Sequence, residues 1–233
     1  MRVFTAILFF GIFLLVTSAQ AQLLDTKAKQ AFMIDASTGT VLFEKNADEP
    51  VPPASLAKLM TMEVVFQALK SGRRVGSEAF PVSENAWRTG GAPSGTSTMF
   101  AALKSQVPII DLVRGTIVQS ANDACIILAE GFAGSEQAFA EQMNERAMAI
   151  GLNGSVFKNS NGLPADGQKV TMRDLVKLGS HIGREYPELY QIYSEPEFTW
   201  NKITQRNRNP LLALDIGVDG MSTGFTEESG YAI

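Results

Sequence analysis

A serine and a lysine three positions apart are the residues of this sequence best suited to chemistry. Ser55 precedes Lys58 at a spacing that places both side chains on one face of a helix. Lysine can act as a base toward a serine hydroxyl when burial or a nearby cation lowers its pKa. At a helix N-terminus, free backbone N–H groups would favour developing negative charge. The pair therefore predicts a serine nucleophile that is activated by a lysine.

The chain contains one histidine, His181, and one cysteine, Cys125. A Ser-His-Asp scheme would have to use His181, which lies inside a predicted helix and is better explained as a solvated or packed side chain. Cys125 stands among apolar residues, which is typical of a small core residue. These counts exclude H-E-x-x-H and thiolate zinc sites, and neither a G-x-S-x-G elbow nor a phosphate loop occurs. We therefore expect no metal and no cofactor.

Short motifs of this kind also occur by chance. A second S-x-x-K motif begins at Ser155 in a turn-rich stretch, and S-x-N occurs both at Ser83 and at Ser120. On spacing alone, Ser120 could merely cap the helix that follows it. Order along the chain and structural context must therefore separate a site from coincidence.

Hydrophobic periodicity and turn residues divide the chain into short strands and amphipathic helices. Strands at both ends with helices between them indicate an α/β or α+β layer fold. Segments rich in turn formers are expected to be loops with short strands. The predicted elements are a hairpin (31–35, 40–45), a helix (55–71), loops (73–107), helices (109–119, 124–132, 136–150), a turn-rich stretch (155–168), a helix (171–185), a strand (198–203) and two strands within 221–233 around a turn at 227–230.

The order of three motifs resembles that of the penicillin-recognising serine enzymes. The stretch P-A-S-L-A-K-L-M-T from Pro53 is similar to the S-x-x-K region of low-molecular-weight D-alanyl-D-alanine carboxypeptidases, and Q-S-A-N-D-A-C from Gln119 is similar to their S-x-N region. Ser222-Thr223-Gly224 stands where the family has K-T-G. Short matches at 207–209, 218–220 and 223–226 extend the likeness over about residues 28–233.

The resemblance implies a β-lactamase/transpeptidase-like fold, with an antiparallel sheet flanked by helices beside an all-helical lobe. It implies that Ser55 attacks the terminal D-Ala-D-Ala bond of a peptidoglycan stem peptide, that Lys58 takes its proton and that Ser120 relays this proton. β-Lactams would acylate Ser55 as covalent inhibitors. Without the resemblance, one of the implied substrate-binding residues, Arg208, could equally be a solvated charge. The full implied set is Asn122, Arg208, Ser222, Thr223, Gly224 and Phe225.

Two features depart from the family pattern. Ser222 replaces the lysine that opens the third motif, which removes a fixed cation beside the nucleophile and predicts weaker catalysis. The sequence stops at Ile233, inside a predicted strand. We therefore expect residues 22–233 to be a catalytic domain that is incomplete at its C-terminus and has unpaired strand edges.

Residues 1–21 are expected to be a cleaved signal peptide. Arg2 precedes an apolar run from Val3 to Val16, which is short for a membrane span, and Ala19-Gln20-Ala21 is a small-residue cleavage signal. The protein is therefore expected in the periplasm or cell envelope of a bacterium, with no membrane anchor visible in the chain. A formal net charge of −4 argues against a nucleic-acid partner.

Two alternatives to a D,D-carboxypeptidase stay open. A class A β-lactamase would need an E-x-x-L-N segment to place its deacylating water, and none occurs between Asn122 and Ser222. A catalytically degenerate penicillin- or cell-wall-binding protein would explain the absent motif lysine. Covalent labelling by penicillin and release of D-alanine distinguish the three functions.

Overall fold

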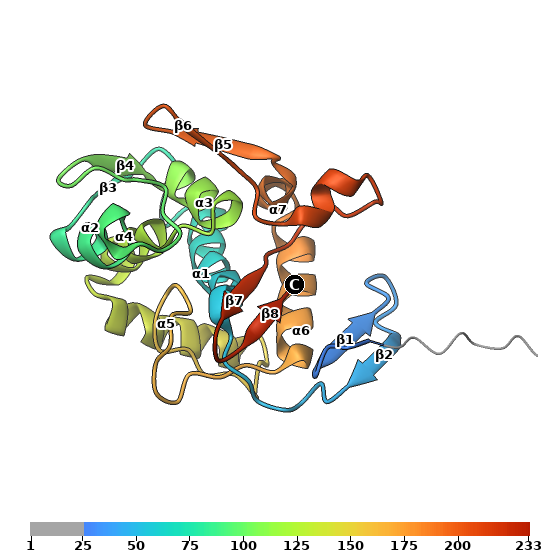
Figure 1. Ribbon diagram of the computed structural model, residues 1–233. Coiled ribbons are helices and arrows are strands. Elements are labelled where there is room, and N and C mark those ends of the chain that lie inside the picture. The colour runs from blue at the N-terminus through green and yellow to red at the C-terminus, as the bar shows by residue number, and fades with distance from the viewer. Residues whose placement is uncertain (1–25) are drawn as a thin grey trace, which may run out of the picture.

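The computed structural model describes residues 26–233, so the predicted signal peptide lies outside the described residues. The described residues begin and end with pairs of strands, and the helices lie between them in the sequence (Figure 1). The helices are α1 (Lys58–Lys70), α2 (Glu84–Thr89), α3 (Ile109–Val118), α4 (Asn122–Ala133), α5 (Glu136–Ala149), α6 (Met172–Glu185) and α7 (Pro187–Tyr190), with 3-10 turns η1 (Ala54–Ala57), η2 (Ala92–Ser94), η3 (Gln191–Ser194) and η4 (Pro210–Leu214).

The strands pair in antiparallel fashion, which confirms the mixed helix-and-strand class. Within residues 26–233 they form four separate two-stranded sheets rather than one joined sheet. The pairs are β1 (Ala31–Ile34) with β2 (Val41–Lys45), β3 (Ala79–Pro81) with β4 (Gln106–Pro108), β5 (Glu197–Trp200) with β6 (Ile203–Arg206), and β7 (Gly224–Thr226) with β8 (Gly230–Ala232).

Helix α1 lies in the middle of the molecule, and helices α3, α4, α5 and α6 all contact it (Figure 1). Its side chains are buried around most of its circumference, including Met60, Val65 and Phe66, none of which is exposed to solvent. A helix that is buried on most of its sides belongs to a core rather than to a surface. The Ser55-Lys58 pair is therefore attached to the most enclosed element of the fold.

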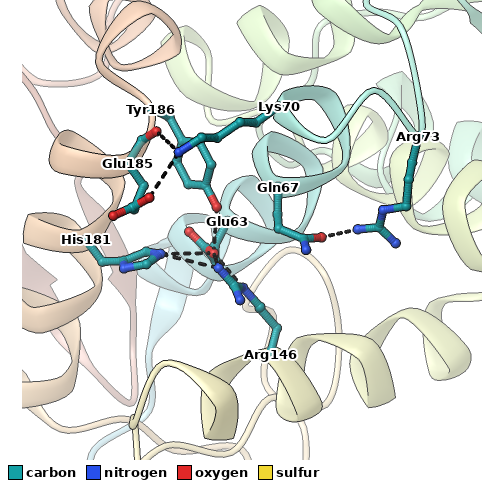
Figure 2. Close-up of polar contacts among 8 residues, drawn as sticks. All are labelled: Glu63, Gln67, Lys70, Arg73, Arg146, His181, Glu185 and Tyr186. Atoms are coloured by element: carbon teal, nitrogen blue, oxygen red, sulfur yellow. Dashed lines mark hydrogen bonds and ion pairs between the residues drawn. The ribbon is translucent and has the colours of Figure 1, made fainter.

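A buried carboxylate links α1 to two of its neighbours (Figure 2). Glu63, fully buried on α1, accepts hydrogen bonds from Arg146 Nε at 2.7 Å and from Tyr186 Oη at 2.9 Å. His181 Nε2 lies 3.3 Å from the same Glu63 oxygen. The structure thus confirms that His181 is a packed helix residue, and Cys125 is likewise buried in the core.

Two predicted elements are wrong. The expected loop over 73–107 contains α2, whose first turn is capped because Ser83 Oγ accepts a hydrogen bond from Ala86 N at 2.9 Å. The expected single strand over 198–203 is the hairpin β5–β6, with Asn201 and Lys202 at φ 47° and 63° in its turn. Two successive left-handed residues suit a tight hairpin, but lysine seldom adopts this conformation and so carries no turn signal.

Candidate active site

The serine and the lysine of the first motif are in direct contact. Ser55 lies in η1 and Lys58 begins α1, and Lys58 Nζ lies 2.9 Å from Ser55 Oγ. Lys58 is only 3% exposed, and within residues 26–233 no carboxylate lies within ion-pair distance of its amine. Burial therefore lowers the pKa of Lys58, which favours the neutral amine. A neutral amine at this distance can accept the proton of the serine hydroxyl.

A loop from a distant part of the chain packs on the start of α1. The carbonyl oxygen of Asn161 accepts a hydrogen bond from Lys58 Nζ at 2.8 Å. Gly162 has φ +82°, and a Cβ at this position would lie 1.7 Å from the carbonyl oxygen of Ala54, so only glycine fits. The sequence predicts a turn-rich stretch here but not its contact with Lys58, because that contact uses a backbone carbonyl, which every residue type carries.

The second motif lies at the start of α4, on another wall of the site. Asn122 Nδ2 donates to Thr96 Oγ1 at 3.0 Å, while the buried Oδ1 of Asn122 has no hydrogen-bond partner within residues 26–233. The predicted alternative that Ser120 caps the helix is wrong, because Ala121 is the N-cap and makes no side-chain capping bond. Ser120 is half-buried with φ 53°, and no described hydrogen bond joins its side chain to Ser55 or Lys58.

Asp123 holds the neighbouring wall in place, a role that the sequence did not reveal. Its buried carboxylate accepts hydrogen bonds from Thr98 Oγ1 at 2.6 Å, from Met99 N at 3.0 Å and from Ala101 N at 3.1 Å. Burial nevertheless raises the pKa of Asp123. These bonds connect α4 to the segment that carries Thr96.

The third motif runs into β7, which lies against η1. A Cβ on Gly224 would lie 3.1 Å from the backbone nitrogen of Ser55, so the two backbones approach closely. Thr223 Oγ1 donates to the carbonyl oxygen of Arg208 at 3.3 Å, which joins this segment to the end of β6. Ser222 is half-buried and precedes β7, and its side chain makes no hydrogen bond within the described part of the chain.

These segments enclose a cleft of about 460 Å³ above the serine. Of the predicted site residues, Ser55, Asn122, Arg208 and Phe225 line it, with Lys58 buried directly below Ser55. Arg208 is exposed but faces this cleft, whereas Ser120, Ser222, Thr223 and Gly224 are not among its lining residues. The remaining lining residues are Gly95, Thr96, Ser97, Asn161, Gly162, Leu163 and Thr226.

Within residues 26–233, no group of three or more His, Cys, Asp or Glu side chains is arranged to hold a metal ion. None of the helices described there has both the length and the apolar character needed to cross a membrane.

A helical core beside antiparallel hairpins, with a serine hydroxyl in contact with a buried lysine amine at a cleft, is typical of the class of serine-type peptidases that includes the penicillin-binding proteins. The chain belongs to the D-alanyl-D-alanine carboxypeptidase family, whose model matches residues 16–233.

Three relatives illustrate the similarity. The chain is 46% identical over 206 residues to D-alanyl-D-alanine carboxypeptidase DacC of Escherichia coli K12, covering 88% of this chain and 52% of that protein. Penicillin-binding protein 5 of Haemophilus influenzae superposes with a TM-score of 0.85 at 41% identity, over 89% of this chain and 60% of that one. Penicillin-binding protein D2 of Listeria monocytogenes, in an ampicillin-bound form, gives 0.74 at 30% identity, over 89% and 83%. The chain spans about half the length of the curated relatives it matches.

Proposed function

We propose that the chain is a serine-type D-alanyl-D-alanine carboxypeptidase that removes the terminal D-alanine of peptidoglycan stem peptides. The observation that carries this proposal is the 2.9 Å contact between Ser55 Oγ and the amine of Lys58. This amine is buried and has no carboxylate partner within the described residues. The family and the names of the relatives supply the substrate, which the geometry of a serine-lysine pair alone does not specify.

In the proposed reaction, Ser55 Oγ forms a bond to the carbonyl carbon of the penultimate D-alanine while neutral Lys58 takes the hydroxyl proton. The backbone N–H groups of Ser55 and Phe225 stabilise the resulting oxyanion. The close approach of Gly224 to Ser55 supports this role, because it brings the β7 backbone beside the nucleophile. The C–N bond then breaks, and Ser120 relays the proton to the departing amine of D-alanine.

The cleft also offers groups for holding the substrate. The buried Oδ1 of Asn122 lacks a partner within the described residues, so a substrate amide N–H would satisfy it. Arg208 and Thr223, joined through the Arg208 carbonyl, would bind the terminal carboxylate of the substrate. Water then hydrolyses the acyl-enzyme and frees Ser55.

β-Lactams, which mimic the D-Ala-D-Ala peptide, would acylate Ser55 in the same way. The ampicillin-bound form of the Listeria relative supports this part of the proposal. We further propose that residues 1–21 direct export, so that residues 22–233 act as a catalytic domain in the bacterial periplasm, where the peptidoglycan substrate lies.

The test is covalent labelling of the folded chain by fluorescent penicillin, followed by an assay of D-alanine release from a pentapeptide ending in D-Ala-D-Ala. Ser55→Ala and Lys58→Ala should abolish labelling. Lys158→Ala is the matched control and should leave labelling unchanged. Lys158 is exposed and ends the second S-x-x-K motif, which lies in the turn-rich stretch. A folded chain that takes no label would support a cell-wall-binding protein. A labelled chain that hydrolyses β-lactam but releases no D-alanine would indicate a β-lactamase.

A further inference from the structure

One face of α1 holds two successive carbonyl groups of the segment 159–163, here called the docking loop. Thr61 Oγ1 donates to the carbonyl oxygen of Ser160 at 2.6 Å, and Lys58 Nζ donates to that of Asn161 at 2.8 Å. Residues 58 and 61 are three apart, so their side chains lie on the same face of the helix, one turn apart.

Both contacts are shielded from water. Thr61 and Ser160 have no exposed surface, and Lys58 and Asn161 are 3% and 4% exposed. A buried carbonyl group that loses its donor cannot form a replacement hydrogen bond to water. Each of these two hydrogen bonds therefore constrains the docking loop. Within residues 26–233, the other hydrogen-bond partner of the Thr61 hydroxyl is the sulfur of Met143 at 3.8 Å, which is a weak acceptor.

We propose that Thr61 is a positioning residue for the reaction: by fixing the Ser160 carbonyl, it sets the adjacent Asn161 carbonyl that orients the amine of Lys58. A neutral amine carries two N–H groups and one lone pair. When Asn161 accepts one N–H, rotation about the Cε–Nζ bond is restricted and the lone pair is held toward Ser55 Oγ. This inference rests on the proposed function, in which Lys58 takes the proton of Ser55.

Several charged or titratable groups lie around Lys58 and could affect its pKa, but Thr61 is not one of them. Cys125 on α4 is the titratable neighbour of the amine, and burial raises the pKa of its thiol to about 11. Glu136, at the start of α5, accepts a hydrogen bond from Ser160 Oγ at 2.9 Å, and Arg208 lies across the cleft. Because Thr61 carries no charge, a changed titration of Lys58 in a Thr61 variant reports the position of the docking loop.

The experiment compares Thr61→Val, which keeps the shape but removes the donor, with Thr61→Ser, which keeps the donor and loses a methyl group. The rate of acylation by labelled penicillin is measured against pH, per active site titrated. The titration midpoint of Lys58 is measured separately by NMR of the chain with labelled lysine ε-carbons. In Thr61→Val we expect a plateau rate about tenfold lower, since one hydrogen bond is lost. We also expect a lower Lys58 midpoint, because a carbonyl acceptor favours the charged amine. Thr61→Ser should resemble the unsubstituted chain.

Equal plateau rates and equal midpoints in Thr61→Val and the unsubstituted chain would overturn the proposal, even if Thr61→Val melts at a lower temperature. A shifted midpoint in Thr61→Ser would also overturn it, because packing of the methyl group would then be the cause. If Thr61→Val does not fold, Thr61→Cys, a weak donor, replaces it with the same expectation and the same overturning result. An unsubstituted chain that never reacts with penicillin would refute the proposed function, whereas the NMR midpoints would still decide the role of Thr61.

Discussion

At the scale of single residues, the burial of Lys58 suits this residue to the proposed role of base. An exposed lysine is protonated at neutral pH and cannot accept a proton from serine. Lys58 is buried, and its hydrogen bonds go to a hydroxyl and a carbonyl rather than to a carboxylate. Desolvation is therefore the largest influence on its pKa, and it favours the neutral form.

The pH dependence of acylation should follow this amine. Lys58 must lose its proton to act as the base, so the rate of penicillin acylation should rise with pH through the pKa of Lys58. Because burial lowers this pKa, the half-maximal rate should fall below pH 10.5, the ordinary value for lysine. Stopped-flow acylation measured across the pH range checks this expectation. Lys58→Arg, which stays charged, should show no acylation at any pH, and a half-maximal rate at or above 10.5 would contradict the argument.

Position 222 should limit the rate. We propose, from the resemblance to the family, that a lysine there would place a fixed cation near the substrate carboxylate and near Lys58. A charge-assisted contact at a desolvated site contributes about 2–4 kcal/mol, or roughly 30- to 1000-fold in rate. We therefore expect Ser222→Lys to raise the acylation rate and D-alanine release by at least about 30-fold. Ser222→Met is the control, because a methionine side chain is similar in length to lysine but carries no charge. Unchanged turnover in Ser222→Lys would show that position 222 does not matter in this chain.

At the scale of elements, the site depends on how closely β7 approaches η1. Gly224 leaves room for the two backbones to meet, since a Cβ there would lie 3.1 Å from Ser55 N and 3.2 Å from the Cβ of Ala54. Both of these neighbours belong to η1, the turn that carries Ser55, so neither can move aside without displacing Ser55.

Replacing Gly224 by alanine should therefore separate β7 from the nucleophile. We expect Gly224→Ala to lower the acylation rate about tenfold or more while the chain stays folded, because the Phe225 N–H would no longer reach the oxyanion. The control is Gly183→Ala on α6, where a Cβ would meet only Tyr190 at an ordinary distance of 3.8 Å. Penicillin labelling rates together with circular dichroism check the prediction. Equal acylation rates in Gly224→Ala and Gly183→Ala would contradict this prediction.

At the scale of the whole molecule, the Glu63 network connects the helix of the active site to the rest of the core. Its partners come from three segments: Arg146 on α5, His181 on α6 and Tyr186 just after α6 (Figure 2). Breaking a buried ion pair by removing one partner is costly, because the remaining charge loses its compensation. None of these four residues lines the cleft, so a change in this network should alter the stability of the fold without altering acylation.

Glu63→Gln should lower the free energy of unfolding by about 2–3 kcal/mol, a value reduced from that of a fully buried pair because Arg146 is partly exposed. Urea denaturation measures this change. Penicillin labelling of the folded fraction should be unaltered. The control is Glu145→Gln, an exposed carboxylate on the same helix as Arg146, which should change stability by less than about 0.5 kcal/mol. Equal stability losses in the two variants would contradict the role assigned to Glu63.

Much of this arrangement could be predicted from local sequence. The capped start of α6 at Thr171, the hairpin β1–β2 and the helical pair α3–α4 all follow from short-range periodicity and turn residues. The hairpin β5–β6 and helix α2 could not be predicted as readily, because the turn at Lys202 and the short length of α2 leave weak signals.

The sequence by itself determined that the side chains of Ser55 and Lys58 would lie on the same face of a helix, because residues three positions apart are neighbours on a helix surface. Only the tertiary structure decided what surrounds them. The Asn161 carbonyl comes from 103 residues away, and Asn122 meets Thr96 across 26 residues. Such contacts join backbone atoms or common side chains over long chain separations, so no local pattern specifies them. Packing of the described helices and loops around α1 brings them together, and it also buries the amine that the proposed chemistry requires.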